Sequence, residues 1–366
     1  MGAEKKTRIG IVGTGGIANA HMKYYITFDD VEIVGACDIV PGKAREFLDR
    51  YGLDKVPAFE DLAEMIEQIP MDGASVCTYH RTHASCSIAL MEAGIHVLCE
   101  KPMSFTLQEA ADMVRVSRQA KKILTIGFQP RFSYMRQKVD DFIRSGALGK
   151  VYYVEGGDGR RRGLSVGNFI RKETAGYGVI GDTGCYVVDQ CMHAINYPRP
   201  LTASAMTSCH FGRNPKYSEF ADIYEVEDFA TAYIRLEGDI TYVFKQAWAM
   251  HFDRLGDTYW LGTEGSIRLK GGFKEHNTPS DVIFYTDVNG LHADSFLLPS
   301  KPFDAYGDNI EVDSWREKMR TFADAVLTNG PAPVPCEEIL YNQAILDGIY
   351  RSAQLGKEVD IVIPDV

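Results

Sequence analysis

The stretch "RIGIVGTGGIA", from Arg8 to Ala18, decides the fold of the first part of this chain. It begins as a short apolar run typical of a buried strand and continues as a glycine-rich turn that opens a predicted helix. Gly13 permits the tight turn, Gly15 lets the backbone approach a pyrophosphate, and Ala18 allows close packing of the helix. The stretch therefore predicts a dinucleotide-binding turn, in which N–H groups at the helix N-terminus face the phosphates.

Short apolar runs and amphipathic segments alternate from residue 8 to residue 128. Strands separated by helices of this length form a parallel sheet with helices on both faces, so we expect the α/β class with a doubly wound Rossmann sheet. The predicted strands are 8–13, 31–38, 73–78, 96–100 and 123–128. The predicted helices are 17–28, 42–51, 84–93 and 107–120.

Asp38 closes the second predicted strand, twenty residues after Ala18. A carboxylate at this place accepts hydrogen bonds from the adenosine ribose and repels a 2′-phosphate, which favours NAD over NADP. Lys43 and Arg45 follow closely and weaken that preference. By itself the glycine motif also fits a turn that binds nothing, but the strand, the helix and Asp38 together favour a cofactor site.

Composition and charge narrow the class of protein. A chain of 366 residues predicts about two domains. The net charge of −11 argues against a nucleic acid or an anionic membrane as partner. The eight cysteines form no C-x-x-C pair, as expected of a reduced protein. Because no apolar run is long enough to span a membrane or to form a signal peptide, we expect a cytoplasmic protein.

A second informative stretch is "GDTGCYVVDQCMH", from Gly181 to His193. At about 100° per residue, Asp182, Tyr186, Asp189 and His193 fall on one stripe of a helix. The other face carries apolar residues, namely Cys185, Val187, Val188 and Met192. Such a helix either holds salt bridges or lines a site.

At "HVLCEKP", from His96 to Pro102, the sequence resembles the Gfo/Idh/MocA family, the group of glucose–fructose oxidoreductase and inositol dehydrogenase. The family signature Glu-Lys-Pro is Glu100, Lys101 and Pro102, at the end of a strand that a Rossmann sheet aims at its ligand. Further blocks in family order extend the resemblance over nearly the whole chain: "THASCSIALMEAGIHVLCEKP", "GFQPRF", "RSGALGKV", "GYGVIGDTGCYVVD", "GTEGSIRL" and "AILDGIYRSAQLGKEV".

The resemblance implies a Rossmann domain, here 1–128, followed by an α+β domain for substrate binding and oligomerisation, here 129–366. In the family the second domain is an open, mostly antiparallel sheet with substrate residues on one face and an oligomer interface on the other, so we expect a homo-oligomer. Strand-like runs at 202–211, 228–236, 240–250 and 266–272 and helical segments at 312–327 and 337–354 fit this arrangement.

The resemblance also implies which residues hold the cofactor. They are Gly13, Thr14, Gly15, Gly16, Ile17, Ala18, Asp38, Thr78, Tyr79, His83, Glu100 and Lys101. The family turn after the third predicted strand commonly has Thr-Pro-Asn, so this chain departs from it at Tyr79 and His80. We further expect a cis Lys101–Pro102 bond, as is frequent in the family. No metal site is predicted, because no carboxylate or thiol completes a ligand set with His80 and His83.

For catalysis, the resemblance assigns substrate binding to Asp182 and proton transfer to the residue four positions later, Tyr186. A lysine ammonium beside a phenol lowers the pKa of the phenol, so Lys101 and Tyr186 make a workable acid–base pair. The catalytic residues that we expect are therefore Lys101, Asp182 and Tyr186.

Other residues are candidates for supporting or binding roles. His193 has a good intrinsic pKa for a base, but it lies about 16 Å along a helix from Asp182, so we expect it to support the site. Asp189 is expected to be a structural carboxylate or one that supports a residue in contact with the substrate. The loop "GDGRRRGLSVGNF" either contacts the substrate or is a solvated charged loop, and His251 is a weaker candidate. The predicted substrate-binding residues are Lys101, Arg162, Asn168, Phe169, Asp182, Tyr186 and His193.

The leading hypothesis is an NAD(P)-dependent oxidoreductase that acts on a secondary hydroxyl of a sugar, polyol or glycoside. The ring C3 hydroxyl as target and a tightly held, internally recycled cofactor are open options within it. One alternative is an NAD-using enzyme of the same fold that cleaves glycosides. Another is a non-catalytic NAD-binding sensor, against which Lys101, Asp182 and Tyr186 argue.

Overall fold

The computed structural model describes residues 6–271, 281–297 and 313–366. The chain divides into two compact units. As far as they are described, unit 1 comprises Met1–Gln129, Asp313–Leu340 and Pro364–Val366, and unit 2 comprises Pro130–Val312 and Tyr341–Ile363. No helix in the described ranges is long and apolar enough to cross a bilayer.

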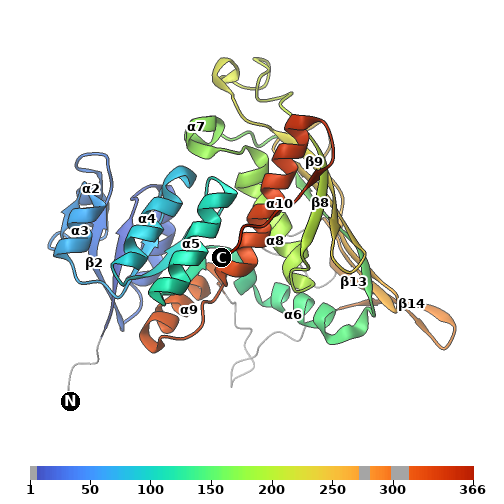
Figure 1. The fold of residues 1–366 in the computed structure, drawn as a ribbon, viewed down its shortest axis with the longest axis horizontal. Helices are drawn as coiled ribbons and strands as arrows, with labels where there is room; N and C mark the ends of the chain where they lie inside the picture. The colour runs from blue at the N-terminus through green and yellow to red at the C-terminus, as the bar shows by residue number, and fades with distance from the viewer. Residues whose placement is uncertain (1–5, 272–280, 298–312) are drawn as a thin grey trace. The chain divides into compact units, whose positions relative to one another are not determined.

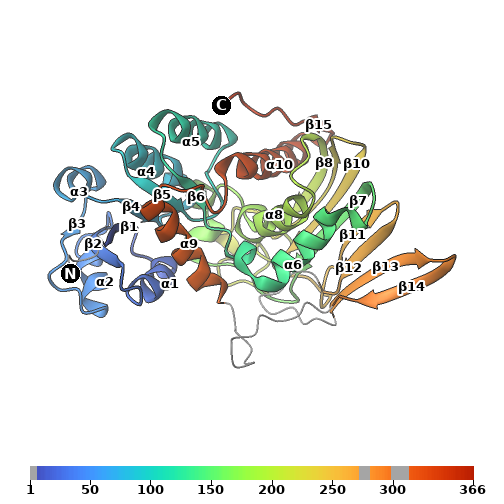
Figure 2. The same ribbon diagram turned by 90° about the horizontal axis from the view of Figure 1, so that it is seen from below.

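Unit 1 is built on a six-stranded sheet with the order β3-β2-β1-β4-β5-β6, in which neighbouring strands pair in parallel (Figure 1; the six strands are labelled in Figure 2). The strands are β1 (Thr7–Val12), β2 (Val31–Cys37), β3 (Ala58–Phe59), β4 (Gly73–Val76), β5 (His96–Cys99) and β6 (Leu124–Ile126). The strand order reverses between β1 and β4, and doubly wound sheets bind ligands at the carboxyl ends of the strands at such a point. This sheet confirms the predicted Rossmann fold.

The helices that follow these strands are α1 (Gly16–Tyr25), α2 (Lys43–Arg50), α3 (Leu62–Gln68), α4 (His80–Glu92) and α5 (Leu107–Ala120). The bounds of α5 are those predicted, because Thr106 and Glu109 form a capping box and Lys121 ends the helix in a left-handed conformation. The sequence does not predict β3 and α3, because a strand of two residues and a helix of seven leave little periodicity.

Helix α9 (Ser314–Thr328) belongs to unit 1 although it lies far along the chain. Its apolar side places Met319, Phe322 and Val326 in the same core as Ile9. A side chain at Gly73 would crowd this packing, since a Cβ there would lie 3.1 Å from Phe322. The predicted division at 128/129 therefore misses the return of residues 313–340 and 364–366 to the first unit. Val312, the first residue of the predicted helix 312–327, lies outside the described residues.

Unit 2 contains a nine-stranded sheet with the order β14-β13-β12-β11-β7-β10-β9-β8-β15. Its described pairs are antiparallel except β7 with β10, which is parallel, so the predicted mostly antiparallel sheet is confirmed. The strands are β7 (Val151–Gly159), β8 (Pro200–Ser208), β9 (Phe229–Leu236), β10 (Ile240–Ala247), β11 (Thr258–Gly262), β12 (Gly265–Leu269), β13 (Val282–Val288), β14 (Leu291–Phe296) and β15 (Val359–Asp360). Residue 272, the end of one predicted strand run, lies outside the described residues.

Helices α6, α8 and α10 cover one face of this sheet (Figure 2). Close packing explains Gly156 in β7, since a Cβ there would collide with the Cys191 sulfur of α8. Along β9, the buried residues Ala232 and Ile234 alternate with the exposed Tyr233 and Arg235, so the opposite face is open. The helices of unit 2 are η1 (Gln129–Phe132), α6 (Tyr134–Phe142), η2 (Ile143–Ala147), η3 (Gly167–Ile170), α7 (Lys172–Ala175), η4 (Ile180–Gly184), α8 (Cys185–Ala194), η5 (Ala221–Ile223) and α10 (Cys336–Leu355), of which η1 and α10 begin in unit 1.

Candidate active site

The glycine turn of unit 1 is shaped for a ligand that approaches the backbone. Gly13 has a φ of 82° and its Cβ would lie 2.9 Å from the Cys77 backbone, so the tight turn after β1 requires glycine. A Cβ at Gly15 or Gly16 would meet no atom within 4 Å, so the chain is open on that side. Within the described residues, no side chain caps the N-terminus of α1. Its first N–H groups therefore suit the phosphates of a dinucleotide.

Asp38 lies directly after β2 and is tied to the same turn. Its Oδ2 accepts hydrogen bonds of 2.9 Å from the backbone N–H and from the hydroxyl of Thr14, and Lys43 Nζ lies 3.0 Å away. Burial by itself would raise the pKa of Asp38, but the hydrogen bonds from Thr14 and Lys43 hold it below its usual value. The carboxylate is therefore ionised and fixed at the end of the strand, as a ribose-binding acid needs to be.

Glu100 and Lys101 follow β5 and differ in their surroundings. Lys101 is partly exposed, and the Lys101–Pro102 bond is cis, as expected. Glu100 is 3% exposed and points into unit 1, where its Oε1 lies 2.6 Å from Lys318 Nζ and 2.8 Å from His21 Nε2. Burial raises the pKa of Glu100, but Lys318 and His21 bring it well below its usual value. The structure thus places Glu100, a predicted cofactor contact, in an interior ion pair.

His83, another predicted cofactor contact, is also enclosed. Its Nδ1 lies 2.8 Å from the Pro102 carbonyl oxygen and its Nε2 lies 3.1 Å from the Thr78 carbonyl oxygen. Burial lowers its pKa. His83 therefore connects the turn after β4 to the turn that carries Lys101, while Thr78 is partly exposed and Tyr79 is exposed. Among the described residues, no group of three or more His, Cys, Asp or Glu side chains is arranged to hold a metal ion.

In unit 2, the segment 180–194 begins as the π-helical turn η4 and continues as α8. Asp182 and Tyr186 are both partly exposed on it. The Asp182 carboxylate accepts a hydrogen bond of 3.2 Å from Trp248 Nε1, and Thr183 Oγ1 accepts one of 2.8 Å from Gln246 Nε2. The end of β10 and the following Trp248 therefore hold the first turn of this segment, in which Asp182 is partly exposed.

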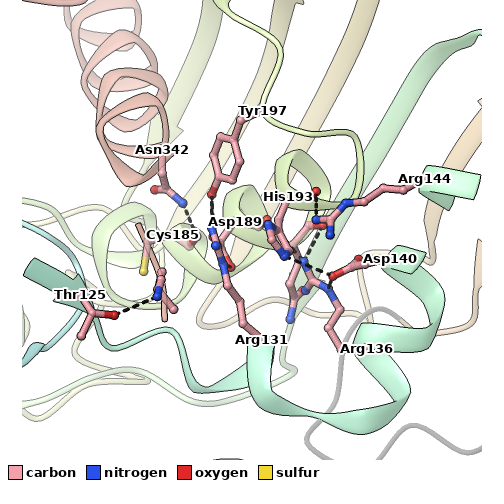
Figure 3. A network of polar contacts seen from close by, with 12 residues as sticks. Thr125, Arg131, Arg136, Asp140, Arg144, Cys185, Asp189, His193, Tyr197 and Asn342 are labelled. Carbon is pink, nitrogen blue, oxygen red and sulfur yellow. Dashed lines mark hydrogen bonds and ion pairs between the residues drawn. The ribbon is translucent and has the colours of Figure 1, made fainter. Parts of the chain in front are cut away.

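The second half of the segment is held by a buried network (Figure 3). Asp189 is 1% exposed and accepts hydrogen bonds from Arg131, the shortest 2.6 Å, and one of 2.5 Å from the Tyr197 hydroxyl. Burial by itself would raise the pKa of Asp189, but the nearby Arg131 more than offsets this and holds the pKa below its usual value. Arg136 bridges Asp140, at 2.7 Å, and the Gln190 carbonyl oxygen, at 2.9 Å. These contacts anchor α8, and they agree with the expected structural role of Asp189.

His193 belongs to this network as well. Its Nε2 lies 3.8 Å from Asp140 Oδ2, and its carbonyl oxygen accepts a hydrogen bond from Arg144. The two interpretations of the polar stripe therefore apply to different parts of it, because Asp189 forms a buried salt bridge with Arg131 whereas Asp182 and Tyr186 are partly exposed.

The loop that follows β7 is hydrogen-bonded to the end of β10 and to the residues that follow it. Arg162 donates a hydrogen bond of 2.9 Å to the carbonyl oxygen of Met250, two residues after Trp248. Its guanidinium lies over the rings of Tyr217 and Phe211, at 4.8 and 5.1 Å from their centroids. His251 Nε2 lies 3.3 Å from the hydroxyl of Tyr217. Asn168 and Phe169 are exposed on the separate turn η3.

The sequence analysis missed residues that position the site. Glu227 is buried, and its Oε1 accepts hydrogen bonds of 2.7 and 3.1 Å from the N–H groups of Gly178 and Ile180, where η4 begins. Burial raises the pKa of Glu227 to about 7. Nothing in its strand-like surroundings indicates this contact. Lys318 could have been found, because it lies on the apolar stripe of α9 three residues after Trp315 and four before Phe322.

Two protein-family models match this chain, and curated proteins are similar to it. The model of the oxidoreductase family with an NAD-binding Rossmann fold (GFO_IDH_MocA) matches residues 7–128, and that of the GFO/IDH/MocA C-terminal domain matches residues 136–268. The chain is 26% identical over 369 residues to the D-glucoside 3-dehydrogenase of Escherichia coli, with 97% of each chain covered. It is 33% identical over 147 residues to the myo-inositol 2-dehydrogenase of Thermotoga maritima, which covers 40% of this chain and 43% of that one.

Solved structures share the fold. Levoglucosan dehydrogenase in complex with NADH has a TM-score of 0.80 and 20% identity, with 99% of this chain and 100% of that chain covered. The aldose-aldose oxidoreductase from Caulobacter crescentus has a TM-score of 0.76 and 21% identity, with 97% of this chain and 100% of that chain covered. Because the two family models together match more than half of the sequence, this chain belongs to the GFO/IDH/MocA family of oxidoreductases, which have an NAD-binding Rossmann fold.

Proposed function

We propose that the protein is an NAD-dependent dehydrogenase that oxidises a secondary hydroxyl of a sugar or glycoside, with the ring C3 hydroxyl as its target. The observation that carries the proposal is the arrangement within unit 1. The glycine turn follows β1 and Lys101 follows β5, so both lie at the carboxyl edge of one parallel sheet with β4 between them. The similarity to a D-glucoside 3-dehydrogenase along almost the whole chain supports the substrate class and the C3 position.

The residues of unit 1 fit a dinucleotide. The N–H groups of Gly15 to Ala18 suit the pyrophosphate, and the ionised Asp38 suits the ribose hydroxyls. Ile39 and Val40 follow Asp38 and are 83% and 50% exposed, so they offer apolar surface for the adenine. Asp38 favours NAD, although Lys43 offsets part of its charge. A nicotinamide cofactor held by these residues would supply the hydride acceptor for the oxidation.

Side chains of the protein bind the substrate hydroxyl and remove its proton. In our proposal, the Lys101 ammonium holds the hydroxyl oxygen, Tyr186 takes the proton from it, and Asp182 accepts a hydrogen bond from the substrate. Trp248 supports this role of Asp182, because a neutral N–H donor orients a carboxylate without cancelling its charge. The reaction then releases the carbonyl product, with one proton left on the protein.

Arg162 supplies a further contact in the proposal. Two rings and a backbone carbonyl fix its guanidinium, so that it loses little freedom when it binds a substrate hydroxyl. Asn168 and Phe169, both exposed, would contact the part of the substrate farther from the reacting carbon.

We also propose a cytoplasmic homo-oligomer. The open face of the unit 2 sheet, with Tyr233 41% exposed and Met206 62% exposed, suits a second copy of the chain. None of the eight cysteines, all of which are described, forms a disulfide, which suits a reducing compartment.

The test is the absorbance of reduced cofactor at about 340 nm. The purified protein is mixed with NAD or NADP and, in turn, glucose, methyl glucosides, 1,6-anhydroglucose and myo-inositol, and products are identified by NMR. A 3-keto glycoside formed with NAD supports the proposal. Release of the aglycone would indicate a glycoside-cleaving enzyme, and cofactor binding without turnover on any substrate would indicate a sensor.

A further inference from the structure

A lysine buried in the core of unit 1 lies next to the Glu100–Lys101–Pro102 turn. The side chains of Lys318, Glu100 and His21 are 1%, 4% and 0% exposed. Glu100 Oε1 lies 2.6 Å from Lys318 Nζ and 2.8 Å from His21 Nε2. Removing two charges from water is costly, so such a pair persists only where each charge compensates the other.

These residues come from three distant parts of the chain. His21 is in α1, Glu100 follows β5, and Lys318 is in α9, 218 residues after Glu100. Arg320 fixes α9 through hydrogen bonds of 2.7 and 3.0 Å to Asp30. The ammonium of Lys318 also lies 4.3 Å from the ring centroid of Trp315. Because α9 returns to unit 1, it places the Lys318 ammonium on the inner side of Glu100.

The Glu100 carboxylate is confined to that inner side. A Cβ at Gly127 would lie 2.7 Å from Glu100 Oε1, so β6 closes one side of the carboxylate. Glu100 Oε2 lies 3.4 Å from the backbone N–H of Lys101. A carboxylate so near in the chain would otherwise be a direct competitor for the Lys101 ammonium.

We propose that Lys318 is a positioning residue for Lys101: by pairing with Glu100 in the interior, it holds that carboxylate on the inner side and offsets the negative charge that would otherwise act on the Lys101 ammonium. The inference rests on the proposed role of Lys101. It gives a reason for a buried lysine that makes no contact with the glycine turn in the interactions described above. It also replaces the predicted cofactor contact of Glu100 with a role in the interior.

Several titratable groups surround Glu100 and respond when the charge of Glu100 or Lys318 is changed. They are His21 and Tyr25 of α1, Cys77 after β4, His83 of α4, Cys99 of β5, the neighbouring Lys101, and Lys318 of α9. Burial and the nearby Lys318 lower the pKa of His21 to about 4, so His21 is neutral at neutral pH and Lys318 alone balances Glu100.

The test measures the titration of Lys101 itself, which does not depend on turnover. Lysines are acylated over a range of pH, and the labelling of Lys101 is followed by peptide mass spectrometry. Lys318→Met leaves the Glu100 charge unbalanced, so the labelling midpoint of Lys101 should rise by about one pH unit or more. In Lys318→Met/Glu100→Gln both charges are gone, and the midpoint should return to the wild-type value. Lys23→Met, an exposed lysine on α1, is the matched control and should not change it.

A second variant guards against loss of folding in Lys318→Met. Lys318→Arg/Glu100→Gln keeps a buried positive charge without its carboxylate, and a guanidinium stays ionised at all accessible pH values. Here the midpoint of Lys101 should fall. A purely structural Lys318 would lower the thermal midpoint and leave the Lys101 titration unchanged in Lys318→Met and in Lys318→Arg/Glu100→Gln, and an unchanged titration in either of these two variants, when folded, overturns the proposal.

Kinetics then separate this proposal from the proposed function. In Lys318→Met the alkaline limb of the kcat/KM profile should shift upwards with the labelling midpoint, and the double variant should restore it. A shifted labelling midpoint in a protein that oxidises no sugar or glycoside would uphold the electrostatic role of Lys318 and refute the proposed function. An unshifted labelling midpoint in an enzyme that oxidises a sugar or glycoside would refute the electrostatic role of Lys318 and uphold the proposed function.

Discussion

Two carboxylates seven residues apart on one helical segment are held in opposite ways. Asp182 is partly exposed and is oriented by the neutral indole N–H of Trp248, whereas Asp189 is buried and is balanced by the guanidinium of Arg131. Glu100 in unit 1 resembles Asp189, because it is buried and balanced by the charge of Lys318. We propose that the two buried, paired carboxylates support the fold, whereas the partly exposed Asp182 carboxylate serves the substrate.

Among the substitutions that test this contrast between carboxylates, Asp189→Asn should have the largest effect on the free energy of unfolding. The substitution leaves Arg131 buried without a carboxylate, and breaking a buried pair in this way costs about 3–5 kcal/mol. Chemical denaturation should show the loss in the free energy of unfolding, while kcat of the folded fraction stays within about threefold of wild type. A stable variant with greatly reduced kcat would instead assign Asp189 to the chemistry.

Glu227 predicts a pH dependence of stability. Its pKa in the folded protein, about 7, lies above the usual value of 4.5, so between these pH values the folded protein binds more protons than the unfolded chain. The free energy of unfolding should therefore decrease as pH rises from about 4.5 to about 7, by about 3 kcal/mol at most, and level off above. Glu227→Gln should flatten this part of the profile. If the variant and the wild type change in parallel over this range, Glu227 is ionised throughout.

Asp182→Asn tests the exposed carboxylate. The amide keeps the shape but loses the charge, so kcat/KM should fall about a hundredfold or more while the thermal midpoint changes little. Steady-state kinetics and thermal unfolding of the same preparation provide the two readings. Loss of stability comparable to that of Asp189→Asn would place Asp182 among the supports.

The smallest effect is expected from Trp248→Phe, which removes the N–H donor and keeps most of the ring. The Asp182 carboxylate then loses one orienting hydrogen bond, worth about 1.5–3 kcal/mol to a charged acceptor, and kcat/KM should fall about tenfold or more. The same substitution in an Asp182→Asn background should have less effect, because the two residues act together. Equal effects in both backgrounds would show that Trp248 acts only through packing.

Local signals explain what the sequence predicted well. Helix α5 is bounded by a capping box and a left-handed residue close in sequence, and the glycine turn and Asp38 follow a fixed spacing after the first two strands, so the chain itself carries the necessary information. The apolar spacing between Gly181 and His193 likewise predicted a helical segment, which the structure has as η4 and α8. The cis Lys101–Pro102 bond followed from the family resemblance rather than from the spacing of residues.

Contacts between distant residues account for what was missed. The spacing of Asp182, Tyr186, Asp189 and His193 shows a stripe, but only the position of Arg131 decides that Asp189 is enclosed. Glu100 and His83, which the resemblance assigns to the cofactor, are held in the interior by Lys318 and by the Thr78 and Pro102 carbonyls, respectively. No pattern along the chain shows that α9 returns to the first sheet.

Lys101→Ala tests the central claim most directly, with NADH binding and turnover measured on the same preparation. Binding is followed by the fluorescence of the bound nicotinamide, and turnover by the absorbance of reduced cofactor with a methyl glucoside. Our account predicts that kcat/KM falls about a thousandfold or more while NADH affinity stays within about threefold, because the ammonium acts on the substrate oxygen. Turnover close to that of the wild type would contradict it.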